Sequence, residues 1–389
     1  MTGVRPEPGA DYRVELVRAA ALIRAAPLVA LACHVEPDGD ALGSLLALHH
    51  LCLAAGKPVV SSWPEPFLVA PHYTFLPGLE ACTKPKDFPA HPDVMVTFDC
   101  GSSGRLGELA APAASAAARG RLIVLDHHRT NDRYGSVNAI DPDAAATAVM
   151  VRRLAATLGW ALTRDAALCL YTGLVTDTGR FQYETTTSEV FDLAAELAAF
   201  SLPIEQMSRQ LFEEHRFAYL QLVSECLARA QLDPDLGLIS TWVSGEDLAA
   251  HDVSVQECEG LIDLVRRAKE ADVACVVKES GGSVRVSLRS TGGIDVGAIA
   301  VAFGGGGHSH ASGWTGHDSV PHVLADIRAA VRQARSRVAQ RGVVSVADTA
   351  LPPGGGPGPT VPSTTGPAGP TSPELIARAG ALEPASDRP

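Results

Sequence analysis

The sequence has little positive charge for a protein that would bind a long nucleic acid. Its 389 residues include 32 Lys and Arg against 44 Asp and Glu, which gives a formal net charge of −12. Proteins bind along a nucleic-acid backbone by neutralising phosphates with Lys and Arg, so this balance argues against a long strand as partner. A short anionic ligand stays compatible with it, because local positive charge or a metal can reverse the sign at one site.

Paired cysteines and long apolar runs are also lacking. The eight cysteines include no Cys-x-x-Cys pair, so neither a disulfide framework nor a zinc knuckle is indicated. No apolar run approaches the roughly 18 residues of a membrane span. The amino-terminal segment has no basic stretch followed by an apolar one, because Arg24 interrupts the Ala-rich candidate. We therefore expect a cytoplasmic protein with buried thiols and no membrane as partner.

Short apolar runs that stop at acids or histidines are the main feature that is present. The polar residues that follow these runs are His34, Asp38 and Asp40 after residues 28–33, Asp99 after residues 93–98, and Asp126, His127 and His128 after residues 122–125. Such runs predict buried parallel strands, and open α/β sheets carry their sites at the carboxyl ends of these strands. We therefore expect these side chains to meet at one edge of a sheet.

Helical segments separate the predicted strands and then dominate the middle of the chain. We expect helices over residues 11–26, 41–55, a segment ending near residue 119, 144–158, 164–176, 188–200, 204–212 and a segment reaching about residue 230, with a further strand over 57–62. The alternation of strands and helices predicts a parallel sheet with right-handed crossovers and helices on both faces.

A second, smaller α/β domain is predicted after residue 232. Its expected strands span residues 238–243, 272–279 and 283–289, the last two as a hairpin, and its expected helices span 254–269, 296–303 and 320–340. Residues 342–389 are rich in proline and glycine and are expected to be disordered. The predicted organisation is a first domain of residues 11–215, a helical linker of 216–231, a second domain of 232–341 and the tail.

The crowding of carboxylates has a chemical consequence. Asp177, just after predicted helix 164–176, adds a fifth carboxylate to Asp38, Asp40, Asp99 and Asp126. Five such groups would repel one another unless divalent cations supplied counter-charge. Carboxylate and imidazole without thiolate suit manganese, and also magnesium, cobalt or zinc. If the loop is locally extended, Asp38 and Asp40 point to alternating sides and can address two cations, with Asp99 as the bridge. Two such cations indicate hydrolysis at phosphorus.

These residues resemble, in their order, the motifs of the DHH phosphoesterase superfamily. The resemblance is carried by His34-x3-Asp38-x-Asp40, Asp99, Asp126-His127-His128 and Asp177, and by Gly304 to Gly313, which resembles the GGGH motif of the DHH-associated C-terminal domain. It covers roughly residues 11 to 335. Ser287 to Ser290 and the glycine-rich segment are most similar to the group of bifunctional oligoribonucleases (nanoRNases) and 3′-phosphoadenosine-5′-phosphate (PAP) phosphatases, whose relatives also cleave linear or cyclic diadenylates.

The resemblance implies a role for each motif residue. One cation would take His34, Asp38 and Asp99, and the other would take Asp40, Asp99, His127 and Asp177. His128 would be a catalytic donor to a phosphate oxygen, and Asp126 would orient the histidines. The residues expected to bind substrate are Arg289, Ser290, Gly305, Gly306, Gly307, His308, Arg105 and Arg180.

The implied function is metal-dependent hydrolysis of short oligoribonucleotides to 5′-mononucleotides, removal of a phosphate from PAP, or both, with cleavage of linear or cyclic diadenylate left open. The expected cofactors are two divalent cations, manganese first. The expected partner is short RNA or a small nucleotide, and a homodimer is left open. One alternative is a manganese-dependent inorganic pyrophosphatase, which would need a cluster of Lys and Arg where this chain offers mainly Arg285 and Arg289. The others are a processive single-strand DNA exonuclease, which the charge disfavours, and a nucleotide-binding sensor without catalysis.

Overall fold

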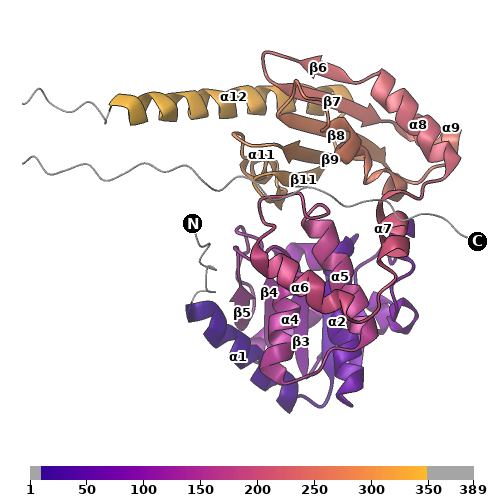
Figure 1. The fold of residues 1–389 in the computed structure, drawn as a ribbon, viewed down its shortest axis with the longest axis vertical. Helices are drawn as coiled ribbons and strands as arrows, with labels where there is room; N and C mark the ends of the chain where they lie inside the picture. Colours follow the sequence, from indigo (N-terminus) through magenta and orange to yellow (C-terminus); the bar gives the residue numbers. More distant parts are fainter. Residues whose placement is uncertain (1–9, 348–389) are drawn as a thin grey trace, which may run out of the picture. The chain divides into compact units, whose positions relative to one another are not determined.

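The computed structural model of the protein describes residues 10–347. Their first half contains a five-stranded, wholly parallel sheet in the order β2-β1-β3-β4-β5 (Figure 1). In this order the strands are β2 (Val59–Ser62), β1 (Val29–Cys33), β3 (Val94–Phe98), β4 (Leu122–Asp126) and β5 (Val137–Ile140). The α/β class and the parallel sheet predicted from the sequence are confirmed.

Helices cover both faces of this sheet because successive side chains of a strand point to opposite faces. Along β1, Val29 and Leu31 join the core under one set of helices, whereas Ala30 and Ala32 pack with α3 (Ala110–Ala118) on the other face. The helices of the first set are α1 (Ala10–Ala25), α2 (Gly39–Ala54), α4 (Thr147–Leu158), α5 (Arg164–Asp177) and α6 (Ser188–Ala198). Because all five strands run parallel, their carboxyl ends lie along one edge.

A second sheet follows α7 (Ile204–Phe212) and α8 (Phe217–Ala228). Its strands, in the order β10-β11-β9-β8-β7-β6, are β10 (Gly306–Gly307), β11 (Ala311–Gly316), β9 (Ser283–Ser290), β8 (Val273–Ser280), β7 (Leu238–Val243) and β6 (Gln231–Asp233). Only β7 and β8 pair in parallel among these described strands. The sheet is therefore mixed, unlike the first one.

Separate apolar cores lie on the two faces of the second sheet. On one face, α11 (Val296–Ala302) and α12 (Val320–Ala347) contribute Ile299 and Ile327 (Figure 1). On the other face, α8 and α10 (Leu261–Val265) contribute Tyr219 and Ile262. The remaining short elements are α9 (Gly245–His251) and 3-10 turns at Pro71–Tyr73, Leu79–Ala81, Pro85–Asp87, Ser103–Leu109 and Val255–Cys258.

Some predicted elements are wrong. The helix expected over residues 254–269 is a 3-10 turn followed by the five-residue α10, because Ser254 and Glu257 close a capping box and Gly260 separates the two pieces. The helix expected to begin at residue 144 begins at Thr147. Strands β5, β6, β10 and β11 were not predicted.

The carboxyl-terminal end also differs from the prediction. Helix α12 continues to Ala347, seven residues beyond its expected end. The rest of the predicted disordered tail, residues 348–389, lies outside the described residues. The predicted domain boundaries stay predictions, since the described residues up to Gly342 form one compact unit. None of the helices within residues 10–347 has both the length and the apolar character that crossing a bilayer requires.

Candidate active site

The loop between β1 and α2 carries the first group of predicted ligands. Asp38 is the N-cap of α2, and its carboxylate accepts hydrogen bonds from the backbone N–H groups of Asp40 and Ala41, at 3.1 and 3.0 Å. This cap fixes the loop and places Asp40 in the first turn of the helix. Helix α2 crosses α5 closely at Gly43, where a Cβ atom would lie 2.4 Å from the carbonyl oxygen of Cys169. The close crossing brings the start of α2 near Asp177, the last residue of α5.

Residues at the amino terminus of α4 donate hydrogen bonds to two of the buried acids. The backbone N–H of Ala148 donates to Asp40 Oδ1 at 2.9 Å, and Thr147 Oγ1 donates to Asp99 Oδ1 at 3.1 Å. A helix amino terminus stabilises negative charge, so α4 is positioned to hold these two carboxylates. Asp99 itself follows β3 with a φ of 51°, a left-handed conformation that costs free energy for a residue other than glycine.

Acids and histidines from four segments meet at the carboxyl edge of the sheet: the loop from β1 into α2, the ends of β3 and β4, and the end of α5. His34 Nε2 lies 3.9 Å from Asp38 Oδ2 and 3.7 Å from Asp99 Oδ2. His127 Nε2 lies 3.9 Å from Asp40 Oδ2, 3.4 Å from Asp99 Oδ1 and 3.3 Å from Asp177 Oδ2. Asp99 therefore belongs to both groups.

The geometry of these two groups suits metal ions. In each of the sets His34, Asp38, Asp99 and Asp40, Asp99, His127, one ligand-type atom per residue lies within 4.8 Å of the others. His127 Nε2 is buried and has no hydrogen-bond partner within residues 10–347, although it faces three carboxylates. A buried nitrogen left in this way is costly unless it serves another purpose, and cation binding would supply one.

Electrostatic strain in the cluster supports the same interpretation. Burial, reinforced by repulsion from Asp99, raises the pKa of Asp40 well above its ordinary value. Burial also raises the pKa of Asp177 to about 7, although nearby His127 opposes the rise. Burial acts on Asp99 too, but His128, His127 and His34 outweigh it and hold the pKa of Asp99 well below its ordinary value. Added cations would relieve the repulsion among these acids.

Asp126 fixes the two histidines that follow it. Its Oδ1 accepts a hydrogen bond from the backbone N–H of His127 at 2.9 Å, and it lies 2.7 Å from His128 Nδ1. His127 Nδ1 lies 3.0 Å from the carbonyl oxygen of Ala144, so a proton on Nδ1 leaves the lone pair of Nε2 free to bind a cation among the acids. The neighbouring carboxylates outweigh burial and raise the pKa values of both histidines.

His308, from the second sheet region, joins these histidines. Its ring centroid lies 4.7 Å from those of His127 and His128, and it stacks on His128 with an interplanar angle of 19°. Burial, together with the positive charge of the two histidines, lowers the pKa of His308 to about 2. His308 is therefore neutral and can accept or donate a hydrogen bond at the cluster.

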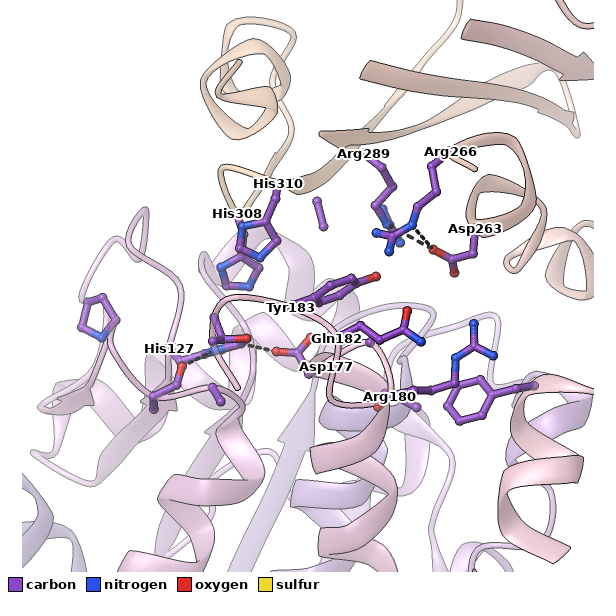
Figure 2. Close-up of a pocket in the computed structure, with 18 of the residues that line it drawn as sticks. His127, Asp177, Arg180, Gln182, Tyr183, Asp263, Arg266, Arg289, His308 and His310 are labelled. Carbon is purple, nitrogen blue, oxygen red and sulfur yellow. Dashed lines mark hydrogen bonds and ion pairs between the residues drawn. The ribbon is translucent and has the colours of Figure 1, made fainter. Parts of the chain in front are cut away.

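A cavity of about 390 Å³ opens beside the cluster (Figure 2). Five of the site residues that the sequence predicted line this cavity: His127, Asp177, Arg180, Arg289 and His308. Sequence reasoning missed the other polar and aromatic lining residues, among them Tyr183, Phe212, Asp263, Arg266 and His310. Figure 2 shows Arg266 and Arg289 side by side above the ring of Tyr183, with Asp263 next to them. Arginine side chains and aromatic rings thus line a cavity to which the cluster of acids and histidines contributes His127 and Asp177.

Other predicted substrate residues lie elsewhere. Arg105 Nη2 lies 3.0 Å from His34 Nδ1, so this arginine contacts a predicted cation ligand. Ser290 is buried, and its hydroxyl accepts a hydrogen bond from the N–H of Gly292 at 3.2 Å. Ser290, Arg105 and Gly305 to Gly307 are not among the cavity-lining residues of the described structure.

The glycine run has a structural reason in addition to any binding role. A Cβ atom on Gly305 would lie 2.2 Å from the carbonyl oxygen of Gly313, and one on Gly307 would lie 2.5 Å from that of Ala311. Gly307 also has a φ of 130°. The glycines therefore allow β10 to approach β11 closely, which places His308 at the end of the hairpin.

An ion-pair network joins the loop of His34 to the second sheet. Lys278 and Arg285 lie directly opposite each other on β8 and β9, and both contact Glu259, at 3.1 and 3.5 Å. Arg285 Nη1 also lies 3.0 Å from Oε1 of Glu36, which has a left-handed φ of 51°. The positive side chains Lys278 and Arg285 and the acids Glu36 and Glu259 thus form a group without net charge. This group holds the loop in place.

Comparison with known proteins agrees with this architecture. Residues 28–174 match the DHH family, N-terminal domain, and residues 238–337 match the DHHA1 domain. The chain is 32% identical over 318 residues to the bifunctional oligoribonuclease and PAP phosphatase NrnA of Thermus thermophilus, a match that covers 81% of this chain and 92% of that protein. It is 25% identical over 325 residues to the protein of the same name from Bacillus subtilis, covering 81% and 97%. Among solved structures, an exopolyphosphatase-related protein from Bacteroides fragilis shares the fold, with a TM-score of 0.76 at 23% identity, covering 86% of this chain and 99% of that one.

Proposed function

Because the chain belongs to the DHH family, and within it to the bifunctional oligoribonuclease and PAP phosphatase group, we propose that it hydrolyses short oligoribonucleotides to 5′-mononucleotides and removes the 3′-phosphate of PAP. The observation that carries this proposal is the pair of ligand sets sharing Asp99, beside a cavity that His127 and several arginines line. Acids that hold cations and arginines that bind phosphate are the two parts that phosphoryl chemistry needs.

The residues that would hold the cations follow from the two sets. His34, Asp38 and Asp99 would hold one divalent cation, and Asp40, Asp99, His127 and Asp177 would hold the other. Oxygen and imidazole ligands favour Mn²⁺, with Mg²⁺ or Co²⁺ as alternatives. When bound, the two cations supply the Lewis acidity that makes water a competent nucleophile at phosphorus and offset the charge of the phosphoryl group.

The remaining site residues orient and stabilise the substrate. Asp126 holds His128 at Nδ1, which leaves Nε2 of His128 to donate to a phosphate oxygen as negative charge develops. His308, neutral and stacked on His128, would hydrogen-bond the same substrate. Arg289 and Arg180 line the cavity and would bind phosphate groups away from the point of attack.

A turnover panel tests the proposal. Wild-type protein with Mn²⁺ should convert a 5′-phosphorylated diadenylate and a short RNA to 5′-mononucleotides, and PAP to AMP. Chelation should stop both reactions, and added Mn²⁺ should restore them. Cyclic diadenylate belongs in the same panel, because its cleavage would extend the substrate class. The proposal fails if none of these phosphoesters turns over.

Pyrophosphate provides the contrasting substrate. Arg285, one of the two arginines that the sequence offered for binding a compact tetra-anion, is already paired with Glu36 and Glu259. We therefore expect slow turnover of pyrophosphate by this protein. Turnover of pyrophosphate that exceeds that of every phosphoester would favour the pyrophosphatase alternative.

A further inference from the structure

Arg266 and Arg289 face one carboxylate that does not satisfy either of them. Asp263 Oδ1 lies 3.7 Å from Arg266 Nε and 3.9 Å from Arg289 Nε (Figure 2). These separations are too long for hydrogen bonds. Asp263 Oδ1 and Arg289 Nε are nevertheless buried atoms without a hydrogen-bond partner within residues 10–347. Two guanidinium groups thus share a single, loosely placed acid at the cavity wall.

Buried donors and acceptors are normally paired, because leaving one unpaired costs free energy. A buried donor or acceptor that is unpaired at a cavity wall indicates a group that pairs with a bound ligand. The two arginines carry more positive charge than Asp263 removes, so the ligand that suits them is an anion. A phosphate group fits best, because its oxygens can accept two hydrogen bonds from one guanidinium group.

The ring of Tyr183 holds Arg266 at this position. The guanidinium carbon of Arg266 lies 4.9 Å from the centroid of the Tyr183 ring, a cation–π contact. The ring of Tyr183 packs directly against Gly179, where an added Cβ atom would lie 2.3 Å from the ring. Gly179 comes two residues after Asp177, a predicted cation ligand. The position of Arg266 is therefore tied to the acid cluster through Gly179 and Tyr183.

We propose that Arg266 determines substrate specificity by binding, together with Arg289, the substrate phosphate that is not hydrolysed. This inference rests on the proposed function. PAP and 5′-phosphorylated dinucleotides share the necessary chemistry, since each carries a second phosphate one nucleoside away from the phosphorus under attack. Asp263 is a positioning residue that keeps the two guanidinium groups together before the substrate arrives.

Two ligands that differ only in the second phosphate test the inference. PAP and adenosine 3′-phosphate carry the same reacting ester, but adenosine 3′-phosphate has no 5′-phosphate. Arg266→Ala should lower kcat/KM for PAP about 10- to 100-fold, the usual range for a lost charge-assisted hydrogen bond. The same variant should change kcat/KM for adenosine 3′-phosphate less than about 3-fold. Arg266→Lys, which keeps the charge but not the fork of donors, should lie between Arg266→Ala and the wild type.

Lys269→Ala provides the matched control. Lys269 is exposed, lies three residues after Arg266 and does not line the cavity of the described structure, so its loss changes the net charge equally. We expect this variant to retain the wild-type preference for PAP. Equal losses on both ligands in Arg266→Ala, or no loss on either, would overturn the inference. Unchanged circular dichroism and unchanged hydrolysis of bis-p-nitrophenyl phosphate establish that the variant is folded.

A binding measurement separates this inference from the proposed function. Calorimetric affinities of both ligands for the metal-free wild type and for Arg266→Ala do not depend on turnover. A selective loss of PAP affinity in Arg266→Ala supports the subsite even if PAP is not a substrate. Equal affinity of the wild type for the two ligands contradicts the subsite, even if PAP is hydrolysed.

Discussion

At the scale of single residues, Asp99 is the acid that the two candidate cation sites share. Asp99→Asn removes one negative charge from both sets while keeping the shape of the side chain. We expect the bound Mn²⁺ to fall below two per chain and kcat to fall by at least about 10²-fold, because the chemistry depends on metal charge. Metal analysis by mass spectrometry, alongside turnover of PAP, measures both. Full metal content with normal turnover would show that Asp99 is not a bridge.

Asp126→Asn is the informative partner of that variant. Asp126 contacts His127 and His128 but is assigned to neither cation set, so its loss should leave the metal content unchanged. We expect kcat to fall about 10- to 100-fold, the usual effect of losing a group that orients a functional histidine. A large loss of metal in Asp126→Asn would place this residue among the cation ligands and correct the assignment.

A residue far from the cavity gives a pH-dependent prediction. Hydrogen bonds from Arg229 and the backbone N–H of Ser244 hold the pKa of Asp247 at about 2 in the folded chain. Because this value lies below the roughly 3.9 of an unfolded chain, Asp247 stabilises the protein above pH 4, and the contribution is lost as the pH falls towards 2. We expect Asp247→Asn to lower the free energy of unfolding by about 1 kcal/mol at pH 7, since the pair is partly exposed.

Urea unfolding at several pH values checks this. The difference between the wild type and Asp247→Asn should stay constant from pH 7 to about pH 5 and shrink below pH 4. Asp235→Asn is the control, because Asp235 is an exposed acid on the turn after β6. A difference for Asp247→Asn that does not change with pH would mean that packing, not charge, stabilises the cap of α9.

At the scale of elements, the turn after α5 connects the acids to the cavity wall. Gly179 and Gly159 both follow helices with left-handed φ values, of 55° and 68°. A Cβ on Gly159 meets nothing within 4 Å, whereas one on Gly179 would collide with Tyr183. Gly159→Ala should therefore cost only the backbone strain, about 1 kcal/mol, with normal turnover.

Gly179→Ala should cost more stability than Gly159→Ala and should also weaken PAP hydrolysis, because Tyr183 must move. Thermal unfolding and PAP kinetics on both variants provide the comparison. Equal effects of the two substitutions would show that the contact between Gly179 and Tyr183 has no part in substrate binding.

The strands that carry the acids were predictable because each is an apolar run that stops at a polar group. Strand β5 was missed because it has only four residues, Val137–Ile140, and includes a polar Asn. Strand β11 was missed because the segment Ala311–Gly316 is rich in Gly, Ser and Thr, and pairing with β9 makes it a strand. Local sequence shows burial and periodicity, but it does not show which distant strand will supply a partner.

The candidate site likewise contains residues that the sequence predicted and residues that it did not. The acids and histidines stood out because their types are unusual at strand ends. Arg266 and Asp263 did not, because charged residues three apart in a helical segment usually lie on a solvated face. Their role depends on Tyr183, some 80 residues earlier in the chain, so only the folded structure brings the three together.

At the scale of the whole molecule, net charge and cavity size predict a preference for short substrates. A phosphate beyond the cavity gains no cation from its wall and approaches a chain with a net charge of −12. We expect much faster hydrolysis of RNA dimers and pentamers than of a 24-mer, and a smaller difference at high salt, because salt screens repulsion. A chromatographic time course with the three lengths at two salt concentrations measures this. Similar rates for all lengths at low salt would revive the exonuclease alternative.

The contact between Arg285 and Glu36 couples two kinds of binding. Arg285 shares β9 with Arg289, and Glu36 lies between the predicted cation ligands His34 and Asp38. We therefore expect metal ions that fix the Glu36 loop to fix also β9, the strand that carries Arg289. By thermodynamic linkage, the factor by which Mn²⁺ tightens AMP binding must equal the factor by which AMP tightens Mn²⁺ binding. Arg285→Ala should reduce both factors together. Bound metal would then no longer change the affinity for the nucleotide, and bound nucleotide would no longer change the affinity for the metal.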